Sequence, residues 1–314
     1  MTKPRTFPPL SRFRGGRPRG ETAIVGALKT NAVLAILGLV LIIVFVMKEA
    51  LPILLDPETQ REASLGRFLQ APAWQPVSDH PRYGLLPLIV GTLKVTLVAM
   101  AFAMPIGVLA AVFTSEFAPR RLREAIKPVV ELLAGIPSVV LGFFALVVMA
   151  SWLNSTLHLG TRLNALNAGI ALSLAVIPTI FTVSEDALRA VPKSFREAAL
   201  ALGASRWQTA WFVTLPAAAA GVSAACLLGL ARAVGETMIV LMASGNAAIL
   251  SGSVFDSART LSATIAAEMA EVVFGSPHYA TLFFLGGLLF VTTFLVNMAA
   301  GVLVDRLRRR LGGS

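Results

Sequence analysis

Two charged side chains inside an apolar run are the first candidates for chemistry. Residues 217–243 contain the string LARAVGETMIV, in which Arg232 and Glu236 stand four residues apart. A continuous helix would place them on one face, where they neutralise each other. A charge facing lipid at the bilayer centre costs about 2.5–3.5 kcal/mol. The pair therefore predicts either a buried lock between helices or a charge site on a route for an anion. We favour the second, because a planar guanidinium matches an oxyanion.

The most polar interior segment is residues 194–216, SFREAALALGASRWQTAWFVTLP. Ser194 with Glu197, and Ser205 with Gln208, both have the spacing of a capping box, in which two side chains satisfy the free amides of a helix start. The segment therefore predicts two short helices joined by a turn, an elbow.

Gly203 stands where a glycine commonly ends a helix, between the two predicted helices of the elbow. The first helix is too short to be stable alone in water. Its apolar face must therefore be received by another surface. The residues of that face are Phe195, Ala198, Ala199 and Leu202.

Composition restricts the class of protein. The 314 residues are 56% hydrophobic, and several apolar runs exceed about 18 residues, the length that spans a bilayer as a helix. The chain is therefore expected to be an all-α polytopic membrane protein. The single Cys226 and three scattered histidines form no metal site, and no glycine-rich loop is present to bind nucleotide phosphates. We expect neither a cofactor nor a metal, and no enzymatic activity.

Six apolar runs predict six transmembrane helices. Gly135, Pro137 and Gly142 in the third run would bend it and allow a close neighbour. Lys94 in the second is expected to extend to the membrane interface. The runs are residues 30–47, 87–114, 128–153, 164–184, 217–243 and 278–303.

The basic residues predict the orientation. Residues 1–29, 115–127, 185–215 and 304–314 hold about nineteen of the 27 Lys and Arg. By the positive-inside rule, these segments and both termini face the cytoplasm. The net charge of +10 is thus a signal of topology and of lipid attraction, and does not indicate nucleic-acid binding.

The chain divides into three parts on this basis. Residues 1–29 are a basic, disordered tail, residues 30–303 form the six-helix domain with its elbow at 185–216, and residues 304–314 are a second basic tail.

Two long segments lie between the apolar runs. Residues 48–86 carry many prolines and predict an ordered but irregular loop. Residues 244–277 contain a possible short helix over 261–273, which forms either an external cap or part of a docking face.

The elbow also carries a family resemblance. Its residues fit the pattern E-A-A-x-x-x-G followed by Leu-Pro, which resembles the EAA loop of ABC importer permeases. The resemblance implies that this loop is a coupling helix seated in a groove of a cytosolic ATPase, and the alternative is a helix lying on the membrane surface. The matching residues are Glu197, Ala198, Ala199, Gly203, Leu215 and Pro216.

Further strings resemble the PstC-type permeases of phosphate importers. They are WQPVSDHPRYGLLPLIVGTL, ELLAGIPSVVLGFF, LARAVGETMIV and TIAAEMAEVVFGSPHYATLFFLGGLLF. The resemblance implies a type I importer permease fold in the bacterial inner membrane. It also implies three partners: a PstA-like permease, a PstB-like ATPase and a PstS-like binding protein. Another anion such as molybdate or sulfate, an ion-coupled secondary transporter, and a membrane scaffold remain as alternatives.

Overall fold

The computed structural model describes residues 19–311 and contains two units, residues 1–48 and 49–314. The first unit holds most of α1 (Arg19–Ala50), an apolar helix long enough to cross a membrane. Because α1 begins at Arg19, residues 19–29 are helical rather than disordered. The remainder of the predicted tail lies outside the described residues.

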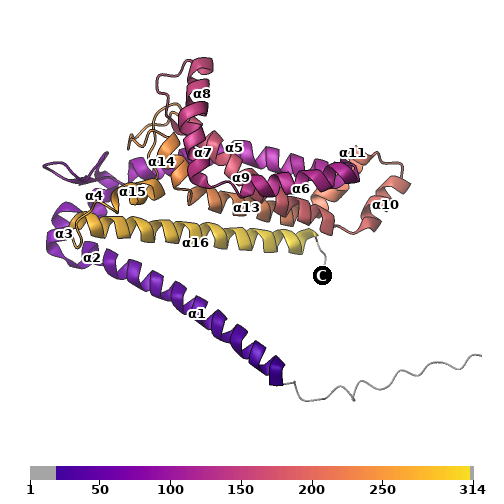
Figure 1. Ribbon diagram of the computed structural model, residues 1–314, viewed down its shortest axis with the longest axis horizontal. Coiled ribbons are helices and arrows are strands. Elements are labelled where there is room, and N and C mark those ends of the chain that lie inside the picture. The colour runs from indigo at the N-terminus through magenta and orange to yellow at the C-terminus, as the bar shows by residue number, and fades with distance from the viewer. Residues whose placement is uncertain (1–18, 312–314) are drawn as a thin grey trace, which may run out of the picture. The chain divides into compact units, whose positions relative to one another are not determined.

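Two helices form the centre of the second unit. α5 (Leu86–Val112) packs along α9 (Ala165–Ala190), α13 (Ala219–Val234) contacts both, and α16 (Pro277–Leu311) runs beside α13 (Figure 1). Small residues allow the close approach. A Cβ on Gly169 would lie 2.4 Å from Cγ1 of Val98. The backbone of α9 therefore packs directly against this side chain of α5.

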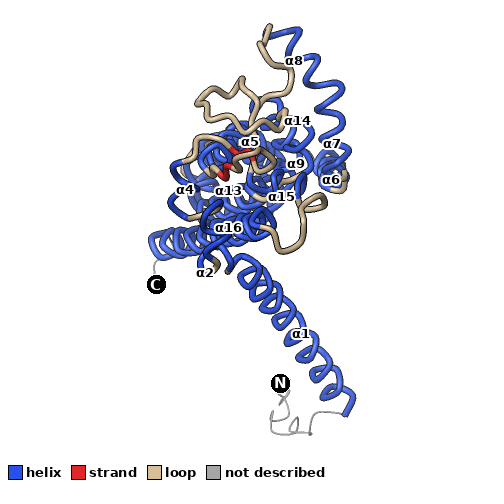
Figure 2. Tube along the Cα trace, turned by 90° about the vertical axis from the view of Figure 1, so that its left-hand side faces the viewer, coloured by secondary structure: helices blue, strands red, loops and turns tan. Residues whose placement is uncertain are grey.

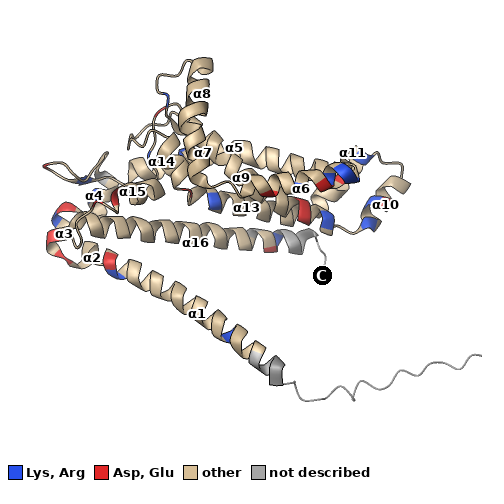
Figure 3. Cartoon of the chain, in the orientation of Figure 1, with Lys and Arg blue, Asp and Glu red and all other residues tan. Residues whose placement is uncertain are grey.

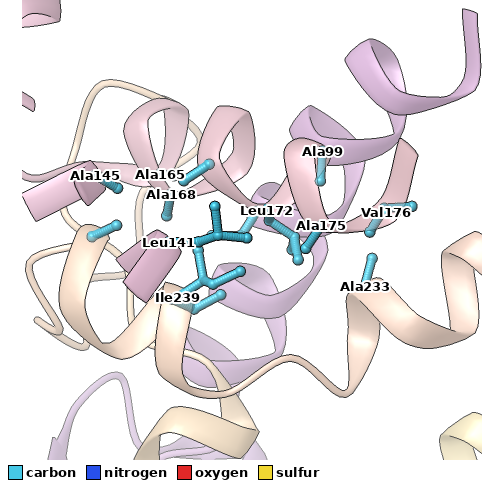
Figure 4. Packing of buried hydrophobic residues seen from close by; sticks show 14 of the residues in the cluster. Ala99, Leu141, Ala145, Ala165, Ala168, Leu172, Ala175, Val176, Ala233 and Ile239 are labelled. Carbon is cyan, nitrogen blue, oxygen red and sulfur yellow. The ribbon is translucent and has the colours of Figure 1, made fainter. Parts of the chain in front are cut away.

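The main hydrophobic core lies along this α5–α9 contact. Alanines of both helices alternate with a few larger side chains, and Ile239 and Ala233 reach it from the C-terminal half (Figure 4). Core members shown in the figure include Ala99, Leu141, Ala145, Ala165, Ala168, Leu172, Ala175 and Val176.

The prediction of one continuous third helix over residues 128–153 is wrong. The structure has an amphipathic helix α6 (Arg120–Ala134) with no buried residue, then a break, then α7 (Ser138–Phe144). Pro137 causes the break, because it disfavours a helical conformation at the preceding residue and donates no backbone hydrogen bond. A π-helical turn η3 (Ala145–Met149) and α8 (Ala150–Leu157) complete the apolar stretch, which spans 138–157.

The predicted fifth helix, residues 217–243, is also interrupted. α13 ends at Val234, and α14 (Met238–Ala243) begins after three intervening residues. Within the described residues, five helices are long and apolar enough to cross a membrane. The number becomes six if the bent pair 206–217 and 219–234, which meets at 72°, is one span. The expected six-helix architecture is therefore obtained with broken helices.

Residues 48–86 are more regular than predicted. Prolines begin two of three short helices, as suits a residue without an amide hydrogen. A two-stranded antiparallel hairpin pairs Trp74 with Tyr83 (Figure 2). The elements are α2 (Pro52–Leu55), α3 (Pro57–Glu62), α4 (Leu65–Gln70), β1 (Trp74–Gln75) and β2 (Arg82–Tyr83).

The segment between α14 and α16 packs onto the start of α5. Lys94 does not extend to the interface as expected: it is buried, and its Nζ donates to the carbonyl of Ser253 at 2.9 Å. The amide of Leu261, which begins α15 (Leu261–Glu268), donates to the hydroxyl of Thr92. A buried ammonium thus fixes this loop on the helix, because losing that partner would leave a charge unsatisfied.

Candidate functional site

The elbow consists of three short helices and a π-helical turn at one end of the second unit. Lys and Arg residues gather at this end, around α6, α10 and α11 (Figure 3). The elements are α10 (Lys193–Ala201), α11 (Arg206–Thr209), η4 (Ala210–Thr214) and α12 (Leu215–Ala217).

Gly203 ends α10 as the sequence predicts. Its φ is 86°, and a Cβ there would meet nothing within 4 Å. The amide of Gly203 donates to Leu200 and that of Ala204 to Ala199, which is the Schellman pattern. Glycine is therefore required for backbone conformation and not for space.

One of the two predicted capping boxes forms. Ser205 accepts from the amide of Gln208, whose side chain accepts from the amide of Ser205. The box predicted at Ser194 is wrong, since α10 begins one residue earlier and its N-cap, Pro192, makes no side-chain bond. Pro192 fixes the entry into the helix instead, because its ring restricts φ.

The apolar face of α10 is open in this chain. None of its residues is buried, and Phe195 and Leu202 are 51% and 90% exposed. Ala198 and Ala199 lie between them and make the surface flat. An exposed face of this kind indicates contact with another protein or with a membrane.

Leu215 and Pro216 lie at the exit of the elbow, where the chain bends into α13. Both line an apolar groove of about 510 Å³ whose opposite wall is α5, from Met104 to Leu109. Elbow and membrane helices therefore meet at this Leu-Pro step.

Sequence reasoning missed one elbow residue, Arg196. Its guanidinium binds the carboxylate of Glu116 with contacts of 2.7 and 3.0 Å. Glu116 belongs to η2 (Phe113–Phe117), the π-helical turn that continues α5. In the sequence, Arg196 is one basic residue among several, and no local spacing reveals a partner 80 residues away.

The second candidate pair, Arg232 and Glu236, is not a helical i,i+4 pair. α13 ends at Val234, so the two residues lie on either side of the break at Gly235. Among the ion pairs of residues 19–311, none joins them. The expected neutralisation is therefore wrong for this structure, because Gly235 ends the helix before it can bring them together.

Each member of the pair has its own contacts. Arg232 is exposed, and its Nη1 lies 3.5 Å from the hydroxyl of Thr179 on α9. Glu236 accepts from the amide of Ile239 at 3.4 Å, at the start of α14. The hydroxyl of Ser262 donates to the carbonyl of Glu236 at 2.7 Å. The carboxylate thus supports the free amides of a helix start, and the guanidinium stays available to another group.

A polar network joins the segments at the opposite end of α5. Glu268 accepts from the indole of Trp74 at 3.0 Å, from Arg259 at 2.6 Å and lies 2.8 Å from Nε2 of His278. The ring of Tyr83 packs against both Trp74 and His278. The carboxylate therefore joins the hairpin, the loop before α15 and the start of α16.

Electrostatics at this network favour the ionised carboxylate. Burial raises the pKa of Glu268, but the hydrogen bonds from His278 and Trp74 and the charge of Arg259 outweigh it and lower the pKa overall. Burial also raises the pKa of Tyr83 to about 12, so its hydroxyl stays protonated. Glu268 belongs to residues 244–277, which were expected to form either an external cap or a docking face. The network gives this segment a fixed shape.

Residues 103–310 match the family model described as the inner membrane component of binding-protein-dependent transport systems. The chain belongs to this family. It is accordingly an inner-membrane component of a transport system that depends on a binding protein, and a transport subunit rather than an enzyme. The matched range contains the elbow and the break in the fifth helix.

Similar proteins of known sequence are permeases. This permease is 41% identical over 239 residues to the probable ABC transporter permease protein YqgH of Bacillus subtilis, covering 76% of this chain and 77% of the relative. It is 36% identical over 264 residues to the phosphate transport system permease protein PstC of Mesorhizobium japonicum, covering 78% and 80%. It is 36% identical over 278 residues to the PstC 1 of Mycobacterium tuberculosis, covering 77% and 82%.

Solved structures show the same fold. A chain of the MetNI methionine ABC transporter, in an inward-facing conformation, has a TM-score of 0.53 at 21% identity, covering 71% of this permease and 94% of that chain. A chain of a bacterial ABC transporter involved in alginate import has a TM-score of 0.58 at 15% identity, covering 90% and 99%. The permease therefore has the type I ABC importer fold that the family resemblance implies.

The Glu268 network predicts a pH-dependent stability. Because the folded pKa is depressed, the ionised carboxylate stabilises the fold above its unfolded value of about 4.3, and this contribution is lost as pH falls through the folded pKa. Glu268→Gln should lower the melting temperature of the detergent-solubilised protein near neutral pH and flatten its fall below about pH 4.3. Glu271→Gln, an exposed neighbour, is the control. Parallel melting curves for parent and Glu268→Gln at every pH would contradict the assignment.

Proposed function

We propose that this permease carries inorganic phosphate across the inner membrane as one subunit of an ATP-driven importer. The observation that carries the proposal is the likeness to relatives named phosphate transport system permease protein PstC, together with an elbow that has the EAA residues and a true αL glycine at Gly203. The chain contains no nucleotide-binding loop, so a separate subunit must hydrolyse ATP.

The proposed complex has three further components. A PstA-like permease would complete the pathway, a PstB-like ATPase would receive α10, and a PstS-like protein would deliver the anion. The open apolar face of α10, with Phe195 and Leu202 exposed, supports the second contact. A groove in the ATPase would bury that face, and about 25 cal/mol is gained per Å² of apolar surface removed from water.

Arg232 is the proposed anion contact on the route. It is an exposed guanidinium at the end of a membrane helix, and within residues 19–311 its one side-chain hydrogen bond is the long one to Thr179. Planar donors of this kind bind a tetrahedral oxyanion through two parallel hydrogen bonds. Glu236, across the break, supplies the negative charge that prevents the anion from binding too tightly to leave.

The orientation rests on the distribution of basic residues. We propose that the end carrying α6 and α10 faces the cytoplasm, as do both termini, because basic residues gather there (Figure 3). The hairpin and the Glu268 network would then face the outside, where a binding protein arrives.

Coupling is tested at α10. Glu197→Arg reverses a charge on the proposed docking helix, and Gly203→Val forces a branched residue into positive φ at a cost of about 1–3 kcal/mol. Both should reduce co-purification of the ATPase and abolish uptake while leaving membrane insertion normal. Gly203→Asn is the matched control, since asparagine tolerates this conformation and the space is open. Normal attachment and transport in Glu197→Arg and Gly203→Val would remove the coupling assignment.

Substrate and route are tested together at Arg232. Vanadate-sensitive uptake of radiolabelled phosphate by vesicles should persist in excess sulfate or molybdate. Arg232→Gln should lower it by at least about tenfold, because a hydrogen bond to a charged group contributes about 1.5–3 kcal/mol. Glu236→Gln should also reduce uptake strongly, although its amide oxygen can still accept from Ile239. Complex yield should stay normal in both.

Arg162→Gln, which removes an arginine remote from the break, controls for the loss of one charge. A purely structural role gives a different result: each variant loses complex yield together with uptake. Parental uptake in the double variant, Arg232→Gln with Glu236→Gln, would show that Arg232 and Glu236 do not serve the anion route. Uptake that is insensitive to vanadate would indicate an ion-coupled carrier.

Topology is tested by labelling single cysteines in intact cells, in a Cys226→Ser background. An impermeant thiol reagent should label a cysteine replacing Arg67, in α4, and should not label one replacing Arg206, in α11. After permeabilisation both should react. The reverse pattern in intact cells would overturn the orientation.

A further inference from the structure

The turn η2 at the end of α5 is contacted twice by the elbow. The carboxylate of Glu116 meets Arg196 of α10, and the ring of Phe117 lies 5.9 Å from that of Trp207 on α11. Two consecutive residues of one turn thus meet α10 and α11, the first two helices of the elbow. A π-helical turn is an uncommon element that often marks functional sites.

Arg196 is the principal tie between α10 and the rest of the chain. In the described part of the chain, no other side chain of α10 forms a hydrogen bond or ion pair with another element, and none of its residues is buried. The same guanidinium also donates to the carbonyls of Leu188 and Val191, at the end of α9, at 2.8 Å each. One side chain therefore holds α10 to two central helices.

The ion pair differs from an ordinary surface pair. The side chains of Arg196 and Glu116 are 21% and 9% exposed, and their contact is bidentate. The pair of Arg120 with Glu124 on α6 has side chains that are 91% and 63% exposed. Screening by water and salt weakens the second pair and spares the first. Bidentate geometry also fixes direction, so a displacement of the guanidinium moves the carboxylate with it.

The receiving turn is held firmly in place. Arg123 of α6 donates to the carbonyls of Thr114 and Ser115, two acceptors within η2. η2 continues α5 directly, without a connecting loop, and therefore moves together with it. At about 1.5 Å per residue, the stretch from Val112 back to Lys94, which holds the loop at Ser253, spans about 27 Å.

We propose that Glu116 and Arg196 are a positioning pair that transmits the displacement of α10 to α5. The proposal rests on the proposed role of α10 as the ATPase contact. The open face of α10 binds the ATPase, and the guanidinium on its inner side pulls η2. Breaking the pair should leave the ATPase attached to α10 and disconnect its movement from the membrane helices.

The test uses the complete complex of permeases, ATPase and binding protein in proteoliposomes. Arg196→Gln and Glu116→Gln are measured for co-purified ATPase, ATP hydrolysis and phosphate uptake. We expect normal co-purification and sustained hydrolysis, while uptake per ATP hydrolysed falls roughly fivefold or more, the scale of a typical coupling between sites. Arg120→Gln, which breaks the exposed pair on α6, should keep the parental ratio.

Two results would overturn the inference. Parental uptake per ATP in both variants would show that the pair transmits nothing. Loss of the ATPase from both would show that the pair only attaches it. A failure of the coupling assignment itself is seen elsewhere, in Glu197→Arg and Gly203→Val, which leave Arg196 unchanged. The two failures are therefore distinguishable.

Discussion

The close contact between α5 and α9 is the constraint on which the second unit depends. Helices in lipid gain nothing from burying apolar surface against each other, so they associate through tight packing of small residues. Gly169 against Val98 and Gly107 against Ile180 bring the two helices together, and α13 follows with Gly229 against Ile180. Larger side chains at these positions would separate the helices that carry the elbow, the break and the Glu268 network.

The two broken helices share a physical logic. Non-helical backbone is tolerated at membrane depth only where protein or a water-filled cavity surrounds it. The break at Gly235 meets this condition because Ser262 donates to the carbonyl of Glu236, and α7 approaches α14 at Gly142. The break also leaves Arg232 at a helix end, where a guanidinium is not confined to one face. The loss of the expected i,i+4 pair is therefore what frees this arginine.

Local signals in the sequence predicted the helices and turns. Contacts between residues far apart in the sequence could not be predicted from it. Gly203 and the Ser205 capping box were readable because cap chemistry depends on adjacent residues. The six apolar runs were readable. At Pro137 the sequence predicted a bend, whereas the structure has a full break with the amphipathic α6 before it. Arg196 with Glu116 and Lys94 with Ser253 could not be found, because their partners lie 80 and 159 residues away. In each case a charged residue resembled an ordinary solvated one.

The Glu268 network carries a consequence for how the protein is made. Its partner Trp74 lies 194 residues earlier, and His278 belongs to α16, the last helix. Chains emerge from the ribosome N-terminus first, so the hairpin and the loop at Arg259 are available before α16 is complete. Until His278 is synthesised, the half-buried carboxylate of Glu268 lacks one of its partners. The segments that it joins cannot yet adopt their final packing. Closure of this network is thus a late event in biogenesis, and a chain that stops before α16 leaves the hairpin and the loop at Arg259 without one of the residues that join them.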